Sequence, residues 1–390
     1  MILTQCAVCA TPLPHPRLQC GICKTPYCGR DCQKLHWKGG HRALCPQIKR
    51  GGGAEQYHAT QKYAEAVAVA VMKCSEDTRG QTCYICTEAL HWKTKEGLVR
   101  GCACRGTAGF AHASCLAEQA KILVAECEEN NLDAQAMQSR WDRWDYCGLC
   151  EQRYHGVVAC ALGWACWKTY VGRPEADFAR CAAMNSLGDG LTDAEHLEDS
   201  VTVREAQVSM LRRVGAPADQ MLVAQGNLAQ CYSRLGRKEE ALPMFEAIYS
   251  GHLELFGNEE KNTITSAMNY AISLFGLRHF DEAKSVLREM LPVARRVLGE
   301  NSVETLKMRS MHASALYKVA DTLDDLREAV NTFEETVPTT RRVLGGAHPL
   351  VRVVEEDLQK ARAALALRAS GGDDVSALRD SIAAMTPGDA

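Results

Sequence analysis

Sixteen of the chain's twenty cysteines lie within its first 150 residues, and this crowding constrains the fold more than any other feature of the sequence. The chain begins Met-Ile-Leu-Thr-Gln, without the basic and apolar segments of a secretory signal, so we expect it in the reducing cytoplasm or nucleus. No apolar run of about 18 residues is present, so no membrane-spanning helix is expected. Cysteines in a reducing compartment are typical of metal sites, and the crowded segment is therefore expected to fold around metal ions.

The first cluster supplies eight candidate ligands in four short pairs. They are Cys6, Cys9, Cys20, Cys23, Cys28, Cys32, His41 and Cys45. Eight such ligands suffice for two tetrahedral zinc ions, and each short pair lets one turn present two ligands to one ion. A segment of this length cannot bury a self-sufficient apolar core, so the metal must supply the folding free energy.

This cluster resembles the MYND zinc finger over residues 6–45, and the match includes Tyr27-Cys28 and the run Cys32-Gln33-Lys34-Leu35-His36-Trp37 before Gly40-His41. The ligand pairs of that family interleave. The resemblance implies one zinc ion on Cys6, Cys9, Cys28 and Cys32 and a second on Cys20, Cys23, His41 and Cys45. MYND fingers bind short proline-containing peptides, and the matching groove residues are Gln33 and Trp37. For Trp37, packing over the zinc site is the alternative role.

The second cluster supplies eight more ligands, in the order four cysteines, one histidine and three cysteines. They are Cys83, Cys86, Cys102, Cys104, His112, Cys115, Cys147 and Cys150. The PHD finger and the RING-CH finger share that order. The single residue between Cys102 and Cys104, and the seven residues before His112, resemble RING-CH and disfavour PHD. The cross-braced family pattern implies one zinc ion on Cys83, Cys86, His112 and Cys115 and another on Cys102, Cys104, Cys147 and Cys150, which makes four structural zinc ions in all.

RING-CH domains recruit a charged ubiquitin-conjugating enzyme and promote transfer of ubiquitin to a substrate lysine. The resemblance makes the chain a candidate RING-type ubiquitin ligase, in which Ile85 matches the family's apolar contact to that enzyme and Leu149 is a second candidate contact. Gln119 stands where the family usually has Trp, and Glu151 where some ligases place a cation. A non-catalytic, zinc-stabilised interaction scaffold is the alternative function. No pattern of a catalytic nucleophile or a phosphate-binding loop is present, so no catalytic side chain is expected.

The C-terminal half repeats itself with a period of 42 residues. Asn227-Leu228-Ala229 returns as Asn269-Tyr270-Ala271, and Glu240-Ala241 returns as Glu282-Ala283. Each copy predicts a helix, a short turn, a longer helix and a Gly stop. These recurring motifs resemble tetratricopeptide repeats of the kinesin-light-chain type, which stack into a superhelix with a concave binding surface. The resemblance implies that Asn185, Asn227 and Asn269 face a peptide groove; a structural amide that caps a neighbouring turn is the alternative role.

The patterns together predict a mostly α-helical protein with two small cross-braced zinc fingers, MYND and RING-CH, followed by an α-solenoid of tetratricopeptide repeats. The expected modules are a MYND finger at 1–50, a helical linker at 51–80, a RING-CH finger at 81–156, a connecting helix at 157–184, the repeat array with a capping helix at 185–369 and a disordered tail at 370–390. Partner or substrate proteins are expected on the MYND finger and in the repeat groove. A net charge of −3 gives no reason to expect nucleic acid, and no membrane partner is expected. The cysteines outside the two clusters are expected to be core residues: Cys74, Cys127, Cys160, Cys166, Cys181 and Cys231.

Overall fold

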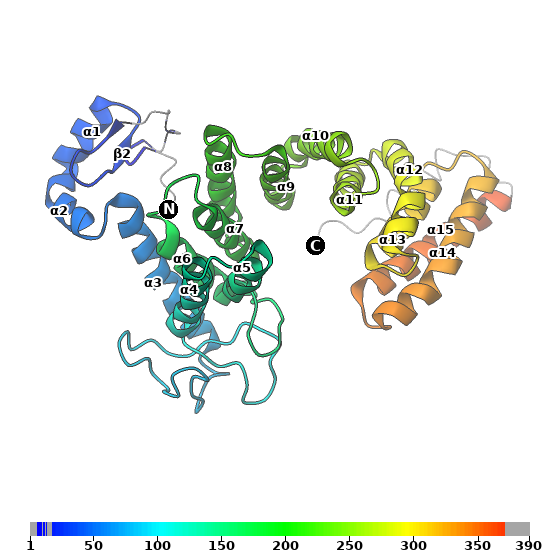
Figure 1. Cartoon of the computed structure of the whole chain (residues 1–390). Coiled ribbons are helices and arrows are strands. Elements are labelled where there is room, and N and C mark those ends of the chain that lie inside the picture. The colour runs from blue at the N-terminus through cyan, green and yellow to red at the C-terminus, as the bar shows by residue number, and fades with distance from the viewer. Residues whose placement is uncertain (1–5, 10, 12, 14–17, 371–390) are drawn as a thin grey trace. The chain divides into compact units, whose positions relative to one another are not determined.

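The computed structural model describes residues 6–9, 11, 13 and 18–370 (Figure 1). The chain divides into two compact units, Met1–Cys231 and Tyr232–Ala390. As the sequence predicts, the described chain is mostly helical, with cysteine-rich modules followed by a helical repeat array. The tail expected at 370–390 lies outside the described residues apart from Ser370.

The N-terminal module is a short hairpin followed by helices. Strand β1 (Leu18–Gln19) pairs antiparallel with β2 (Pro26–Tyr27), and α1 (Arg30–His36), a π-helical turn (Trp37–His41) and α2 (Arg42–Arg50) follow. Gly40 has a φ of 118°, which favours glycine, and this kink precedes the buried His41. The small core consists mainly of cysteines, together with Tyr27, Ile48 and Ala54. Metal ligands therefore form much of the interior of this module.

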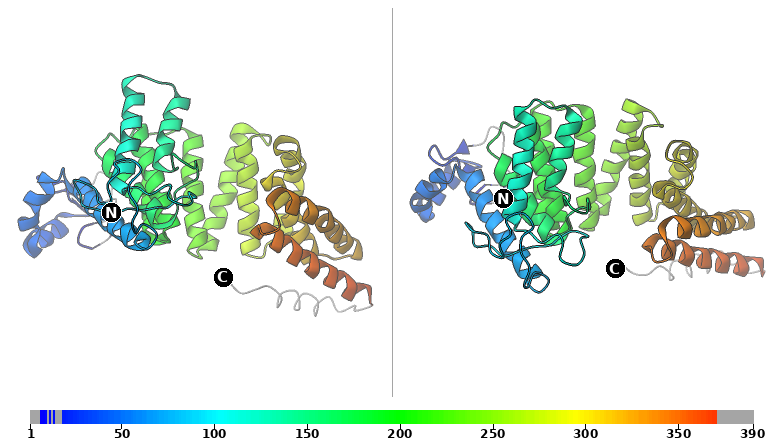
Figure 2. Two further views of the ribbon diagram at one scale, coloured as in Figure 1. Left: turned by 90° about the horizontal axis from the view of Figure 1, so that it is seen from below. Right: turned by 60° about the horizontal axis from the view of Figure 1, so that its bottom comes forward.

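The rest of unit 1 is a group of helices (Figure 2) with two apolar cores, one among the helices and one that includes ligands of the second zinc module. The elements are α3 (Ala54–Cys74), α4 (Ala113–Glu129), α5 (Ala134–Trp141), the 3₁₀ turn Asp142–Trp144, α6 (Gly156–Tyr170), α7 (Phe178–Asp193), α8 (Leu197–Arg213) and α9 (Ala218–Arg234). Four tryptophans fill the middle of the core, namely Trp141, Trp144, Trp164 and Trp167. The helix α6 is largely buried, since ten of its fifteen residues are buried and the other five are half-buried.

The helices α6 and α7 cross at very close range because two glycines lie at the contact. A Cβ atom on Gly163 would lie 2.8 Å from the carbonyl oxygen of Ser186, and one on Gly190 would lie 2.5 Å from that of Ala159. No side chain fits at either place without a backbone shift. The segment 157–184, expected as a connector, thus contains α6 and the start of α7 and lies in the middle of the unit 1 core.

Unit 2 is a stack of helical hairpins. Its described helices, each packed against the next, are α10 (Lys238–Phe256), α11 (Lys261–Gly276), α12 (Phe280–Leu298), α13 (Val303–Lys318), α14 (Leu323–Leu344) and α15 (Pro349–Ala369) (Figure 1). The helices α10, α12 and α14 each end at a glycine with positive φ, namely Gly257, Gly299 and Gly345. The helix α15 packs on α14 and α13 and occupies the position of the expected capping helix. No described helix is both long enough and apolar enough to cross a membrane.

Candidate metal centres and partner surfaces

The structure gathers the predicted ligands into four groups of four. Within each group the ligand atoms all lie within 4.8 Å of one another. The groups are Cys6, Cys9, Cys28 and Cys32; Cys20, Cys23, His41 and Cys45; Cys83, Cys86, His112 and Cys115; and Cys102, Cys104, Cys147 and Cys150. Both clusters are therefore cross-braced, and the chain has four sites whose ligands fit structural zinc.

The separations between sulfur atoms match a zinc tetrahedron. A Zn–S bond of about 2.3 Å places two tetrahedral sulfur ligands about 3.8 Å apart. The observed Sγ–Sγ distances are 3.5 Å for Cys9–Cys28, 3.5 Å for Cys28–Cys32, 3.7 Å for Cys9–Cys32, 3.8 Å for Cys20–Cys45 and 3.8 Å for Cys104–Cys147. These distances are much longer than a disulfide bond, so the thiols are arranged for metal and not for pairing.

The two histidine ligands use different ring nitrogens. His41 directs Nε2 to the Cys23 Sγ at 3.3 Å, whereas His112 directs Nδ1 to the Cys86 Sγ at 3.3 Å. The other nitrogen of His112 lies 3.4 Å from the carbonyl oxygen of Ala89, a contact that orients the ring. Burial lowers the pKa of both histidines and so favours the neutral imidazole that metal binding requires. His36 lies outside all four groups and bonds the Tyr27 hydroxyl through Nδ1 at 3.0 Å.

Three ligand pairs are built on the same backbone turn. In each, the N–H of the first cysteine donates to the carbonyl five residues later, at 2.8 Å from Cys20, 3.0 Å from Cys83 and 3.0 Å from Cys147; Cys6 makes the same bond at 2.9 Å. The residue after the second cysteine has a positive φ in all three, at Lys24, Thr87 and Glu151. The ligand spacing predicts a turn at each pair, but no glycine marks these positions, so the left-handed conformation could not be predicted from the residue types. The backbone hydrogen bonds hold non-glycine residues in a left-handed conformation, and zinc bound to the two cysteines would restrain the turn further.

The residues expected to contact partners differ in exposure. Leu149 is 52% exposed, whereas Ile85 is half-buried and packs against the core of the second module. Trp37 is 40% exposed, and its ring centroid lies 6.0 Å from that of the ligand His41, so it both packs at the zinc site and reaches solvent. Gln33 is half-buried on α1.

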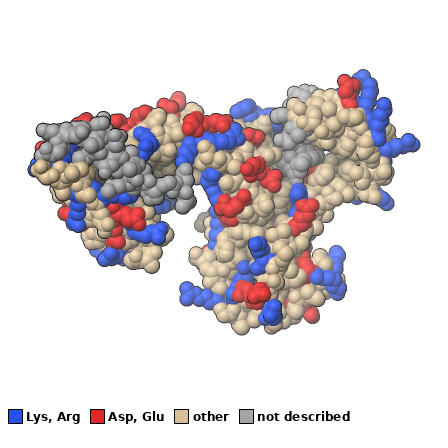
Figure 3. Space-filling view, turned by 180° about the vertical axis from the view of Figure 1, so that it is seen from behind, with Lys and Arg blue, Asp and Glu red and all other residues tan. Residues whose placement is uncertain are grey.

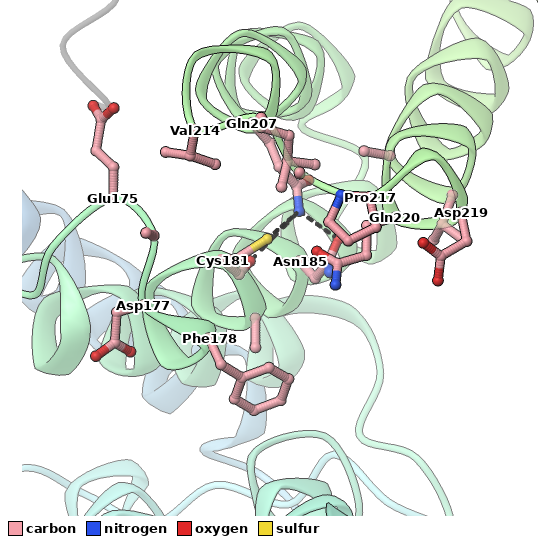
Figure 4. A pocket seen from close by; sticks show the side chains of 17 residues that line it. Glu175, Asp177, Phe178, Cys181, Asn185, Gln207, Val214, Pro217, Asp219 and Gln220 are labelled. Carbon is pink, nitrogen blue, oxygen red and sulfur yellow. Dashed lines mark hydrogen bonds between the residues drawn. The ribbon is translucent and has the colours of Figure 1, made fainter.

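The three repeated asparagines occupy different surroundings. Asn185 lies on α7 and Asn227 on α9, both within unit 1, while Asn269 lies on α11 in unit 2; all three are half-buried. The Oδ1 atom of Asn185 accepts a hydrogen bond from Arg204 Nη1 at 2.8 Å. It accepts a second one from Gln207 Nε2 at 2.9 Å (Figure 4). The acceptor side of this amide therefore has a structural role.

A buried polar network behind Asn185 was not foreseen from the sequence. Arg204 is only 2% exposed, and its guanidinium forms an ion pair with Asp189, which also pairs with Arg153 at 2.5 Å. Arg153 follows the last zinc ligand, Cys150, by three residues. An arginine in a helical segment is normally predicted to be exposed. The only sequence feature related to its burial is the glycine at position 188, because a Cβ atom there would collide with the Arg204 side chain. Through Arg153, Asp189 and Arg204, the network links the end of the second zinc module to the helices α7 and α8.

Charge is mixed over the visible surface. Figure 3 shows Lys and Arg interspersed with Asp and Glu, without a continuous basic stripe. Residues 1–50 are the exception, because they carry eight Lys or Arg and only Asp31 as an acid. This pattern favours protein partners, with an acidic one most compatible with the N-terminal module.

Two family models match parts of the chain. The MYND finger matches residues 6–45, and the tetratricopeptide repeat matches residues 263–304. None of the curated proteins matches the chain. A solved structure of nearly identical TPR-like repeats of kinesin-light-chain type from Podosopora anserina shares 18% identity and covers 56% of this chain and 100% of its own, with a TM-score of 0.42. BtubC (BKLC) from P. vanneervenii shares 15% identity and covers 71% of this chain and 95% of its own, with a TM-score of 0.42. The chain carries a MYND finger and tetratricopeptide repeats, together with a second cysteine-rich module.

Proposed function

We propose that the chain is a RING-type ubiquitin ligase whose residues 83–150 act as a RING-CH finger. In this account the finger holds a charged ubiquitin-conjugating enzyme, while the MYND finger and the repeat array bind substrate or partner proteins. Every zinc position is filled by a protein ligand, so none of the four ions could activate water. The ligase would act by proximity and orientation of the two reactants, without a nucleophile of its own. Zinc thiolates need a reducing compartment, so we place the chain in the cytoplasm or nucleus.

The observation that supports this proposal is the matching position of two apolar side chains on the two zinc knuckles. Ile85 and Leu149 each follow the first cysteine of a ligand pair by two residues. Each donates its backbone N–H to that cysteine's Sγ at 3.4 Å. The cross-brace thus fixes both residues through their own backbones, and a rigid pair of apolar residues suits contact with a partner.

Two other residues support the second candidate function, a non-catalytic scaffold. Gln119 is half-buried on α4, where the family's aromatic contact would lie, and Glu151 is an exposed acid directly after the last ligand. A conjugating-enzyme surface without the aromatic residue would be weaker, since aromatic side chains carry much of the energy of small interfaces.

Ubiquitin transfer assays on the whole chain separate the two functions. The whole chain is needed because cysteine ligands of the second finger share a core with Val67 of α3 and Val158 of α6. With a panel of conjugating enzymes, Ile85→Ala should abolish autoubiquitination and leave the zinc content unchanged. Ile272→Ala is the matched control, because Ile272 is a 48% exposed apolar residue of α11 in unit 2, outside the second zinc module.

A gain-of-function variant completes the test. Gln119→Trp should raise the transfer rate by restoring an aromatic contact. If no conjugating enzyme supports transfer with the wild-type chain or with Gln119→Trp, the ligase proposal fails and the scaffold function stands.

A further inference from the structure

A pocket of 490 Å³ opens between α7, α8 and α9 within unit 1 (Figure 4). Its inner wall is apolar and includes the buried residues Leu211 and Ala224. Three large apolar side chains at the pocket stay partly in solvent: Phe178 at 56%, Val214 at 37% and Val223 at 49% exposed. The volume lies within the range of sites that hold a side chain or a small ligand, and the walls offer that occupant an apolar contact.

One hydrogen-bond donor of the pocket has a fixed orientation. The Oδ1 atom of Asn185 faces Arg204 and Gln207, which both donate to it, so the amide cannot flip. Its Nδ2 group lies on the opposite side of the amide carbon and has no hydrogen-bond partner among residues 18–370. Asn185 lines the pocket. The amide can therefore donate to an occupant but cannot accept from it, and a backbone carbonyl is the matching group.

All charged side chains that line the pocket are acidic. Glu175 is already paired with Arg213 at 2.8 Å, and Asp177 caps α7 by accepting from the N–H of Ala179 at 2.8 Å. Asp219, in the first turn of α9, has no ion-pair or hydrogen-bond partner in the described part of the chain. Asp219 thus supplies a charge that remains available to a cation.

We propose that this pocket binds an extended segment of a partner protein in which a Lys or Arg stands next to an apolar side chain. Asp219 meets the cation, the walls near Phe178 and Val223 take the apolar side chain, and the Asn185 amide donates to a backbone carbonyl. The inference rests on the partner-binding part of the proposed function and is independent of ubiquitin transfer. It also revises the role expected for Asn185, because only the Nδ2 group of its amide contacts the occupant, while Oδ1 is bound to Arg204 and Gln207.

Peptide selection on the full-length chain tests this inference. The probe is a random peptide library displayed on phage, and the most enriched peptide is then synthesised with a fluorescent label for anisotropy titration. The enriched peptides should share a Lys or Arg beside an aliphatic or aromatic residue. Asp219→Asn should weaken the labelled peptide about tenfold or more, as expected for a lost charged hydrogen bond. Phe178→Ala should also weaken it.

The matched control is Asp281→Asn, which removes an 81% exposed acid from the first turn of α12 in unit 2. It should leave affinity unchanged, and Asp219→Asn should keep wild-type thermal stability. Phe178→Ala also removes an edge contact with the core residue Trp141, so its affinity is measured at a temperature at which the variant is fully folded. No enrichment, enriched peptides without a basic residue, or equal affinity of Asp219→Asn and the control would overturn the inference. Ubiquitin transfer is measured on the same variants. If ubiquitin transfer persists while peptide binding fails, only the proposal for the pocket is refuted. If peptide binding persists while ubiquitin transfer fails, only the ligase proposal is refuted.

Discussion

The buried Arg204 gives a stability prediction whose sign depends on which partner is removed. Its guanidinium is 2% exposed, forms an ion pair with Asp189 and donates to Asn185 and Gln207, while its Nε has no partner among the described residues. Asp189 is 39% exposed and has a second cation, Arg153. Removing Asp189 therefore costs folding free energy, because Arg204 stays buried without a counter-ion. Removing Arg204 costs less, because Asp189 keeps both solvent and Arg153.

The expected magnitudes follow from that asymmetry. Asp189→Ala leaves Arg204 buried without its counter-ion, and removing one partner of a buried pair costs about 3–5 kcal/mol. Water already screens Asp189, so we expect the lower end, about 3 kcal/mol. Arg204→Met keeps an apolar chain of similar length, removes the unpaired Nε and leaves Asp189 paired with Arg153. Such replacements are often close to neutral, and we expect a loss of about 1 kcal/mol or less.

Denaturant unfolding followed by tryptophan fluorescence measures both variants. All six tryptophans lie between Trp37 and Trp167, so the signal reports unit 1 alone. The midpoint should fall much further for Asp189→Ala than for Arg204→Met. Equal losses, or a larger loss for Arg204→Met, would refute the argument that the uncompensated cation carries the cost.

The other perturbations concern close packing, metal ligation and surface ion pairs. Gly190→Ala should destabilise unit 1 by about 1–3 kcal/mol in fluorescence unfolding because its Cβ would meet the Ala159 carbonyl, whereas Gly276→Ala, with its nearest neighbour 3.4 Å away, should change thermal unfolding by under about 1 kcal/mol. Cys104→Ser should lower the zinc content from four ions to three and destabilise unit 1, while the circular dichroism of unit 2 persists; an unchanged zinc content would contradict the ligand assignment. Arg296→Gln breaks an exposed pair with Glu259 and should cost under about 1 kcal/mol in thermal unfolding, so a larger loss would show a buried role for that arginine.

The metal centres could be predicted well from the sequence because the short spacing between Cys and His residues identifies them as metal ligands. Short pairs such as Cys6 with Cys9, and Cys83 with Cys86, determine where each half-site forms. The pairing of half-sites came from the family resemblances, and the structure brings the same ligands together. The helical array was predictable for a similar reason, since the 42-residue period repeats whole hairpins.

The core of unit 1 was harder to predict because its signals are not periodic. The run 156–167 is apolar on every face, so it has no amphipathic pattern to show which side packs, and the sequence predicts only a connecting helix at 157–184. The structure places it as α6 against α3, α4 and α7. The close crossing depends on Gly163 and Gly190, and the buried network depends on Arg204; each is an ordinary residue in the sequence, and only a neighbour distant along the chain gives it a role.

The claim that most of the account depends on is that four zinc ions organise the two N-terminal modules. Native mass spectrometry of the full chain, purified without chelator, counts bound ions directly and separates zinc from other metals by mass. We expect four zinc ions per chain, lost together with the fold of both modules when a strong chelator is added. A folded chain that carries two zinc ions or fewer would contradict the assignment of at least one of the two clusters.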